Sequence, residues 1–269
     1  MMRSMALALC LMAGLTIFLG LPRAVVAKDL KLTFVTDDRE TFPYYMGELR
    51  IPGQDPGISV EIIQRAADKV GVKVTFERQP WKRALFRLGS NQFDGAFNAS
   101  YKESRMKLGK YPMKEGKVDP SRSLATVQHM FYKLKTSAAT WDGKVLSGLV
   151  SKVAVVHSYS IVDDLKKAGI PLTTAIEPDL NLRKVLGGRV EMLVEEQSKM
   201  DRMLAKDSDS AAKMSKMEIP FKVKPTYLML SHYFVTRNPK AAEKIWDSIG
   251  EINQSDWLKK RYEYYYKTY

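Results

Sequence analysis

Apolar positions after residue 29 follow the two periods that distinguish strands from helices. Residues 30–36 (LKLTFVT) alternate in polarity and are rich in β-branched and aromatic residues, which predicts a strand. Helical spacing over 58–70 predicts a helix that ends at Gly71, the usual residue after a helix C-terminus. The same criteria predict three further elements: a strand at 72–76, a short helix at 81–88 with Phe86 facing inward, and a strand at 93–97. This alternation is typical of a parallel α/β unit.

A second unit of the same kind follows. It comprises predicted strands at 153–156, 171–175 and 190–194 and predicted helices at 161–168 and 180–186. The C-terminal part predicts an extended segment at 227–235 and amphipathic helices at 239–252 and 256–269. The sequence therefore predicts two α/β lobes, each with a mostly parallel sheet flanked by helices.

Residues 1–27 have the composition of a cleavable secretory signal. Arg3 precedes an uncharged run from Met5 to Leu21, and small residues end the segment ahead of Lys28. The run is at the short end of the range for a membrane span, and Pro22 follows it at once, so cleavage is favoured over anchoring. Cleavage would remove Cys10, the one cysteine, and leave a periplasmic protein without disulfides.

Charge and histidine spacing exclude several classes of function. The 43 Lys+Arg and 30 Asp+Glu residues give a formal net charge of +13, or about +11 without Arg3 and Arg23. The basic residues are scattered and are not interleaved with aromatic residues, so nucleic-acid binding is the least favoured interpretation. The three histidines lack metal-ligand spacing, and neither a G-x-S-x-G motif nor a mature cysteine is present. We predict no metal, no cofactor and no catalytic nucleophile.

Two segments predict helix N-termini at the edge of the sheet. Ser100 and Glu103 fit the S-x-x-E capping box directly after the strand at 93–97, and Arg105 follows in the first turn. Ser160 and Asp163 form a similar pair after the strand at 153–156. A helix N-terminus beside an arginine can bind a carboxylate, although a solvated role for Arg105 is the alternative.

Three more candidate ligand-binding residues lie at the ends of predicted strands: Trp81, Glu195 and Glu196. Trp81 lies at a strand end, where it either packs in the core or faces a ligand. Glu195 and Glu196 end the strand at 190–194, and adjacent strand residues point in opposite directions. We therefore expect one of these acids to face the cleft and the other to be a solvated surface acid.

The order of the motifs LTFVTDD, FPYY, GISVEIIQRAADKVG, PWKRALFRL, FDGAFNAS, ESR, GRVEMLVEE and DWLKKRYEYYY resembles the family 3 extracellular solute-binding proteins. The resemblance covers essentially the whole mature chain. It implies a type II periplasmic-binding-protein fold with lobe 1 at 28–124 and 223–269 and lobe 2 at 125–222. It also implies a monomer that closes its lobes on a small polar solute, an amino acid or related carboxylate, and delivers it to an ABC permease or a sensor domain.

The resemblance also implies roles for individual residues. Arg105 would bind the ligand carboxylate and Glu196 the ligand amine, with Trp81 stacking on the ligand. The remaining ligand-binding positions implied are Phe42, Asn98, Ser100, Ser158, Tyr159 and Ser160. Two departures from the family pattern put an amino-acid ligand in question. Glu196 stands where the family more usually has Asp, and Ser158-Tyr159 stand where a small Gly-Ser pair is common.

An enzymatic function is the alternative hypothesis. The same fold occurs in periplasmic cyclohexadienyl dehydratases, in which a glutamate acts as general acid, and Glu195 or Glu196 would be the candidate here.

Overall fold

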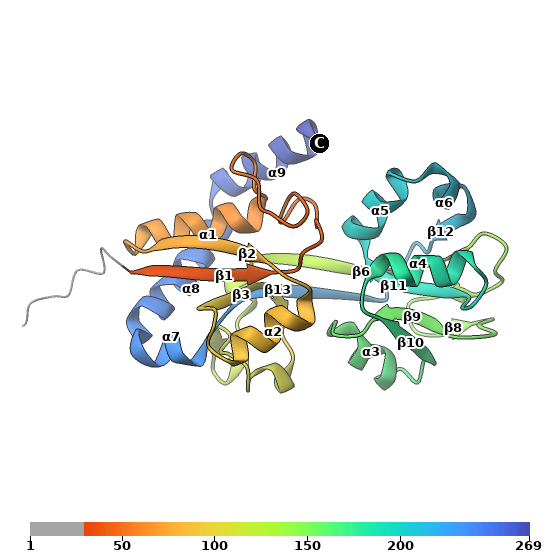
Figure 1. Cartoon of the computed structure of the whole chain (residues 1–269), viewed down its shortest axis with the longest axis horizontal. Helices are drawn as coiled ribbons and strands as arrows, with labels where there is room; N and C mark the ends of the chain where they lie inside the picture. The colour runs from red at the N-terminus through yellow and green to blue at the C-terminus, as the bar shows by residue number, and fades with distance from the viewer. Residues whose placement is uncertain (1–29) are drawn as a thin grey trace, which may run out of the picture.

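The computed structural model describes residues 30–269 as two lobes joined by two long strands (Figure 1). The predicted signal at 1–27 lies outside the described residues. No helix within 30–269 is both long and apolar enough to cross a bilayer.

One sheet of nine strands runs through both lobes in the order β10-β9-β11-β6-β13-β3-β1-β2, with β12 paired to β6. Its strands are β1 (Lys31–Thr36), β2 (Lys73–Arg78), β3 (Gly95–Ser100), β6 (Ala125–Leu134), β9 (Val153–Val156), β10 (Leu172–Ala175), β11 (Met192–Glu196), β12 (Met214–Lys216) and β13 (Lys222–Leu230). β1 pairs in parallel with β2 and β3, and β9 pairs in parallel with β10 and β11. The two parallel groups are connected by β6 and β13, which are antiparallel to each other and to their outer neighbours.

Helices cover each parallel group of strands. We refer to the β1–β3 group as the first lobe and to the β9–β11 group as the second lobe. The first carries α1 (Ile58–Lys69), α2 (Trp81–Gly89), α7 (His232–Arg237), α8 (Pro239–Asn253) and α9 (Asp256–Thr268). The second carries α3 (Ile161–Lys167), α4 (Pro178–Leu186), α5 (Gln197–Ala205) and α6 (Ser208–Lys213). The chain enters the second lobe through β6 and returns through β13. Two hairpins, β4 (Met113–Lys114) with β5 (Lys117–Val118) and β7 (Thr140–Trp141) with β8 (Leu146–Ser147), complete the strands.

The predicted strand-and-helix order is confirmed in both lobes, apart from shifts of one to three residues at element ends. Gly71 follows the C-cap of α1 as predicted, and its φ of +72° is the left-handed conformation usual after a helix C-terminus. The inward placement of Phe86 is wrong: its side chain is 68% exposed, because Trp81, Ala84, Leu85 and Leu88 form the buried face of α2.

The extended segment predicted at 227–235 is also wrong beyond Leu230. The side chain of Ser231 accepts a hydrogen bond from the Phe234 N–H, and this cap starts the short helix α7. The sequence interpretation did not include α5, α6, β6 or β12. Two of these elements, β6 and α5, bring further residues to the cleft.

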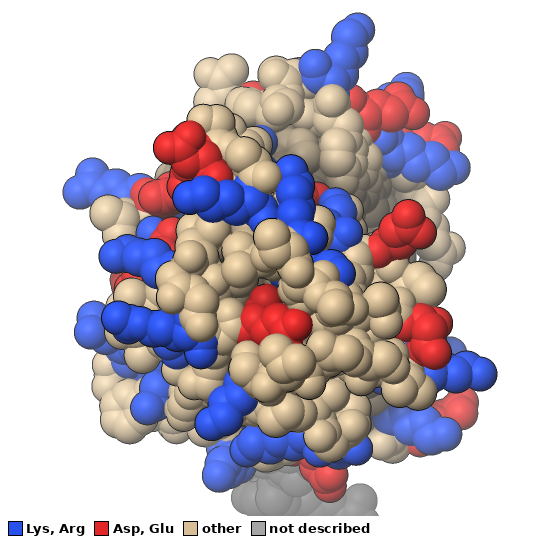
Figure 2. Space-filling model, turned by 90° about the vertical axis from the view of Figure 1, so that its right-hand side faces the viewer, with Lys and Arg blue, Asp and Glu red and all other residues tan. Residues whose placement is uncertain are grey.

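Lysine and arginine side chains are dispersed over the end face of the second lobe, where Figure 2 shows them interspersed with acidic and uncharged residues. A nucleic-acid site needs basic residues gathered on one face, and this face lacks that arrangement.

Candidate functional site

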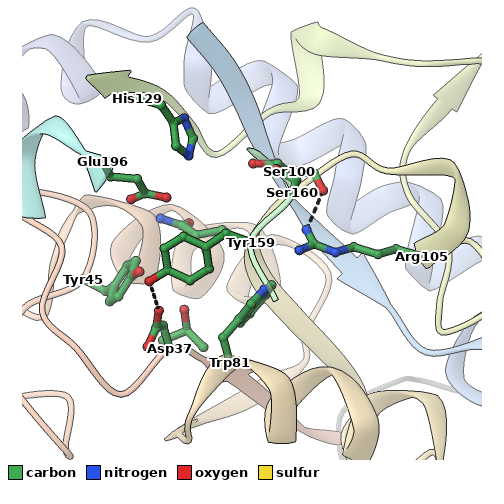
Figure 3. Close-up of a pocket in the computed structure, with 11 residues that line it drawn as sticks. Asp37, Tyr45, Trp81, Ser100, Arg105, His129, Tyr159, Ser160 and Glu196 are labelled. Atoms are coloured by element: carbon green, nitrogen blue, oxygen red, sulfur yellow. Dashed lines mark hydrogen bonds between the residues drawn. The ribbon is translucent and has the colours of Figure 1, made fainter. Parts of the chain in front are cut away.

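A small cavity lies between the lobes at the carboxyl ends of β1, β3 and β9. Its volume is about 30 Å³, enough for one or two water molecules. It is lined by Thr36, Asp37, Tyr45, Trp81, Asn98, Ser100, Arg105, His129, Tyr159, Ser160 and Glu196 (Figure 3). Polar groups from both lobes therefore converge on one pocket, the usual arrangement of a ligand site in an α/β protein.

The Arg105 side chain connects the two lobes. Its Nη1 donates to the Ser100 carbonyl oxygen and its Nη2 to the Ser158 carbonyl oxygen, both at 2.9 Å. The residue is only 5% exposed, and its Cζ lies 5.5 Å from the centre of the Trp81 ring. A guanidinium has five N–H donors, so Arg105 retains donors for a carboxylate.

The two predicted capping boxes are wrong. β3 continues through Ser100, and only a single 3₁₀ turn, Glu103–Arg105, follows, with Lys102 at its N-cap. α3 begins at Ile161 as expected, but the Ser160 hydroxyl makes no capping hydrogen bond. Arg105 is therefore positioned by two carbonyl oxygens, that of Ser100 at the end of β3 and that of Ser158 in the turn after β9.

A buried cluster of Asp37, Tyr159 and Lys199 crosses the cleft. The Tyr159 hydroxyl donates to Asp37 Oδ2 at 2.8 Å, and Lys199 Nζ lies 2.7 Å from the Tyr159 oxygen and 3.2 Å from Asp37 Oδ2. Burial opposes both charges. The mutual attraction of Asp37 and Lys199 nevertheless holds the pKa of Asp37 below, and that of Lys199 well above, its usual value.

The expectation that one of the paired glutamates is a solvated surface acid is wrong. Glu196 lines the cavity, and Glu195 points to the other side of β11 but is only 1% exposed. Burial raises the pKa of Glu195 to about 8 and also raises the pKa of Glu196. Leu193, on the same face of β11 as Glu195, packs in one cluster with residues of α4 and α5, so these helices cover the side that was expected to face solvent.

Two polar side chains in the cavity wall have unused hydrogen-bonding capacity. Neither amide atom of Asn98 nor Nδ1 of His129 has a partner among residues 30–269. Asn98 lies in β3 with a φ of +56°. Burial lowers the pKa of His129 to about 3, so its ring is neutral. Both residues can donate to or accept from a bound solute.

The structure brings together Arg105, Ser100, Asn98, Trp81, Tyr159, Ser160 and Glu196 in the cavity wall. Ser158 reaches the site through its carbonyl oxygen alone. Phe42 does not line the cavity: its ring packs 5.2 Å from Tyr266, with the Arg202 guanidinium 4.9 Å away.

The sequence interpretation missed several residues of this site. These are Thr36, Asp37, Tyr45, His129 and Lys199. Asp37 directly follows the first strand, a position that could have identified it. Lys199 lies in the unpredicted helix α5, and no local motif identifies it. Within residues 30–269 no three His, Cys, Asp or Glu side chains are grouped to hold a metal ion.

Comparison with known proteins identifies the family. The family model of the bacterial extracellular solute-binding proteins, family 3, matches residues 43–268. The chain belongs to this family. Family 3 proteins are extracellular or periplasmic, and their structures share two lobes around a ligand cleft. No relative was found among curated protein sequences.

Solved structures with the family 3 architecture include receptors for amino acids. An amino-acid ABC transporter substrate-binding protein from Streptococcus pneumoniae, bound to L-arginine, is 14% identical over 90% of this chain and 97% of its own, with a TM-score of 0.67. An ancestral arginine-binding protein bound to arginine is 17% identical over 88% and 99%, with a TM-score of 0.66. An ancestral amino-acid-binding precursor of cyclohexadienyl dehydratase is 16% identical over 89% and 97%, with a TM-score of 0.63. At these identities the similarity establishes the fold alone.

Proposed function

We propose that this protein is a periplasmic receptor that captures a small polar solute bearing a carboxylate, an amino acid or a related carboxylate, by closure of its lobes. The observation that carries the proposal is the buried guanidinium of Arg105, which lies between the two lobes with donors to spare. Trp81 beside it offers an aromatic face, and the unpaired Asn98 amide can bind a further polar group. Amino-acid receptors of the same fold support this class of ligand.

The role of Arg105 is tested by thermal shift against amino acids, small carboxylates and polyamines. We expect Arg105→Ala to remain folded and to lose the ligand-dependent stabilisation seen in the unchanged protein, because a buried charge-assisted contact contributes about 1.5–3 kcal/mol. The matched control is Arg189→Ala, which removes an exposed arginine from the second lobe. Retained tight binding by Arg105→Ala would contradict the assignment.

The lobe boundaries and the destination of the solute belong to the same proposal. Lobe 1 comprises residues 28–124 and 223–269 and lobe 2 comprises 125–222, so the hinge lies where β6 and β13 leave the first lobe. The monomeric receptor passes its solute to an ABC permease or a sensor domain.

Export through a cleavable signal predicts that the mature protein begins at Lys28, which its intact mass would establish.

Catalysis is a second candidate function, favoured by one observation. Glu196 lines the cavity with its pKa raised by burial, and a carboxyl that holds its proton can act as a general acid. The proposal is a dehydratase of the cyclohexadienyl type without a cofactor. Turnover of prephenate or arogenate, lost in Glu196→Gln, would support it. Absence of turnover at high protein concentration would leave binding as the function.

A further inference from the structure

The chain itself provides an ammonium group in the cleft. Lys199 extends from α5 of the second lobe to Asp37, which follows β1 in the first lobe, and its side chain is 3% exposed. Its Nζ also lies 2.7 Å from the Tyr159 hydroxyl oxygen. The Lys199–Asp37 ion pair therefore joins the lobes, with Asp37 in the wall of the cavity and Lys199 buried beside it.

An α-amino acid presents a carboxylate and an ammonium group to its receptor. Arg105 suits the carboxylate, and an ammonium group needs an acidic partner in the same cavity. Asp37 and Glu196 are the acids that line it. Figure 3 shows Asp37, Tyr45 and Glu196 on one side of the cavity and Arg105 on the other, with the Tyr159 hydroxyl directed at Asp37.

Lys199 already pairs with Asp37, the cavity acid that the first lobe contributes. Asp37 Oδ2 accepts hydrogen bonds from both the Tyr159 hydroxyl and Lys199 Nζ. The charge of Lys199 also favours the ionised forms of Glu195 and Glu196. A ligand ammonium placed here would meet a like charge in a dry environment and would have to compete for a carboxylate that is already paired.

We propose that Lys199 is a specificity-determining residue that occupies the ammonium position of the cleft, so that the receptor selects carboxylates without an α-ammonium group over the corresponding amino acids. This inference rests on the proposed carboxylate-binding function and narrows its ligand class. An ammonium or guanidinium at the far end of a ligand is not affected, because it would not reach the Asp37 side.

Matched pairs of ligands test the inference on the unchanged protein. Each pair differs only in the α-ammonium group: succinate and aspartate, glutarate and glutamate, 3-phenylpropionate and phenylalanine, 6-aminohexanoate and lysine. Isothermal titration calorimetry is expected to show binding of at least one compound without the α-ammonium group. Its amino counterpart should bind at least about 10-fold more weakly, since like charges at a binding site are strongly unfavourable.

Variants of the ion pair separate the role of Lys199 from its surroundings. Lys199→Met leaves the Asp37 carboxylate without its cation. We expect the ratio of affinities for the two ligands of a matched pair to shift by at least about 10-fold toward the amino compound. Lys199→Arg keeps a cation and should keep the original preference. Lys213→Met, on the exposed surface of α6, is the control and should bind as the unchanged protein does.

The single variant leaves the Asp37 carboxylate buried without its cation, so Asp37→Asn/Lys199→Met is the second variant. This double variant removes both charges. Its preference for the ligand without the α-ammonium group over the matching amino acid should be smaller than that of the unchanged protein. An unchanged preference in either folded variant would overturn the inference.

The wild-type titrations separate two kinds of failure. Amino compounds that bind as tightly as their counterparts would overturn the inference and leave the proposed function in place. If none of the eight compounds binds, the carboxylate-binding function falls, and the inference falls with it.

Discussion

At the scale of single residues, burial decides which charges in and around the cleft are present at neutral pH. Glu195 illustrates this, because burial raises its pKa to about 8 while its neighbour Glu196 adds a like charge. The sequence placed both acids at a strand end but could not tell that Glu195 is buried. Whether an acid is ionised depends on the side chains packed around it, which come from elements distant in sequence.

We predict that Glu195 makes the protein less stable as the pH rises. The folded state holds the Glu195 proton up to about pH 8, whereas the unfolded chain releases it near the ordinary carboxyl pKa of 4.5. Between these values the unfolded state binds fewer protons, so the free energy of unfolding falls as pH increases. Glu195→Gln cannot titrate, and its melting temperature should fall less between pH 5 and 8.

The difference between the two proteins is on the order of a few kcal/mol, or several degrees in melting temperature for a chain of this size. Glu263→Gln alters an exposed glutamate on α9 and should give the wild-type curve. Parallel pH profiles for the unchanged protein and Glu195→Gln would contradict the prediction.

At the scale of elements, the sequence is most informative where a local rule decides the structure. α1 combines apolar residues at helical spacing with Gly71 after its C-cap, and the helix was predicted to within a residue. The capping rule failed at Ser100 because β3 pairs with β13, Ser100 lying opposite Thr226, and this pairing keeps Ser100 in the strand. Tertiary pairing thus overrides a local capping signal.

We predict that Gly71→Ala destabilises the protein by about 1 kcal/mol, because a side chain at φ of +72° is strained. No atom lies within 4 Å of the added Cβ, so the cost is conformational and not steric. Chemical denaturation measures it.

Gly53→Ala is the matched control, since Gly53 also has open space around its Cβ and lacks a positive φ. Equal stability of the Gly71→Ala and Gly53→Ala proteins would contradict the explanation.

At the scale of the whole molecule, polar contacts across the cleft hold the lobes together. The Arg39–Glu177 and Lys102–Asp163 ion pairs, at 2.8 and 2.7 Å, join the lobes at partly exposed positions, where they contribute little. The Tyr159–Asp37 hydrogen bond is buried and the Arg105–Ser158 hydrogen bond partly buried, so they contribute more. Hinge motion about β6 and β13 would have to break these contacts.

We predict that Tyr159→Phe shifts the protein toward open conformations. The variant loses the hydroxyl that bonds Asp37 and Lys199, which weakens closure by on the order of 2 kcal/mol. Small-angle X-ray scattering of the protein without added solute should then show a larger radius of gyration.

Tyr233→Phe, at an exposed tyrosine on α7, is the control. Identical scattering from the Tyr159→Phe protein and the unchanged protein would show that the hydroxyl does not hold the cleft closed.

The sequence by itself determined the α/β class, the order of most strands and helices, and the candidacy of Arg105, Trp81 and Glu196, because periodicity and strand-end position are local properties. Only the tertiary structure decided that Phe86 faces outward, that Glu195 is buried and that His129 reaches the cavity. It also brought Lys199 to Asp37, 162 positions away along the chain. The physical reason is that burial and ion pairing depend on groups that meet only when the lobes pack together.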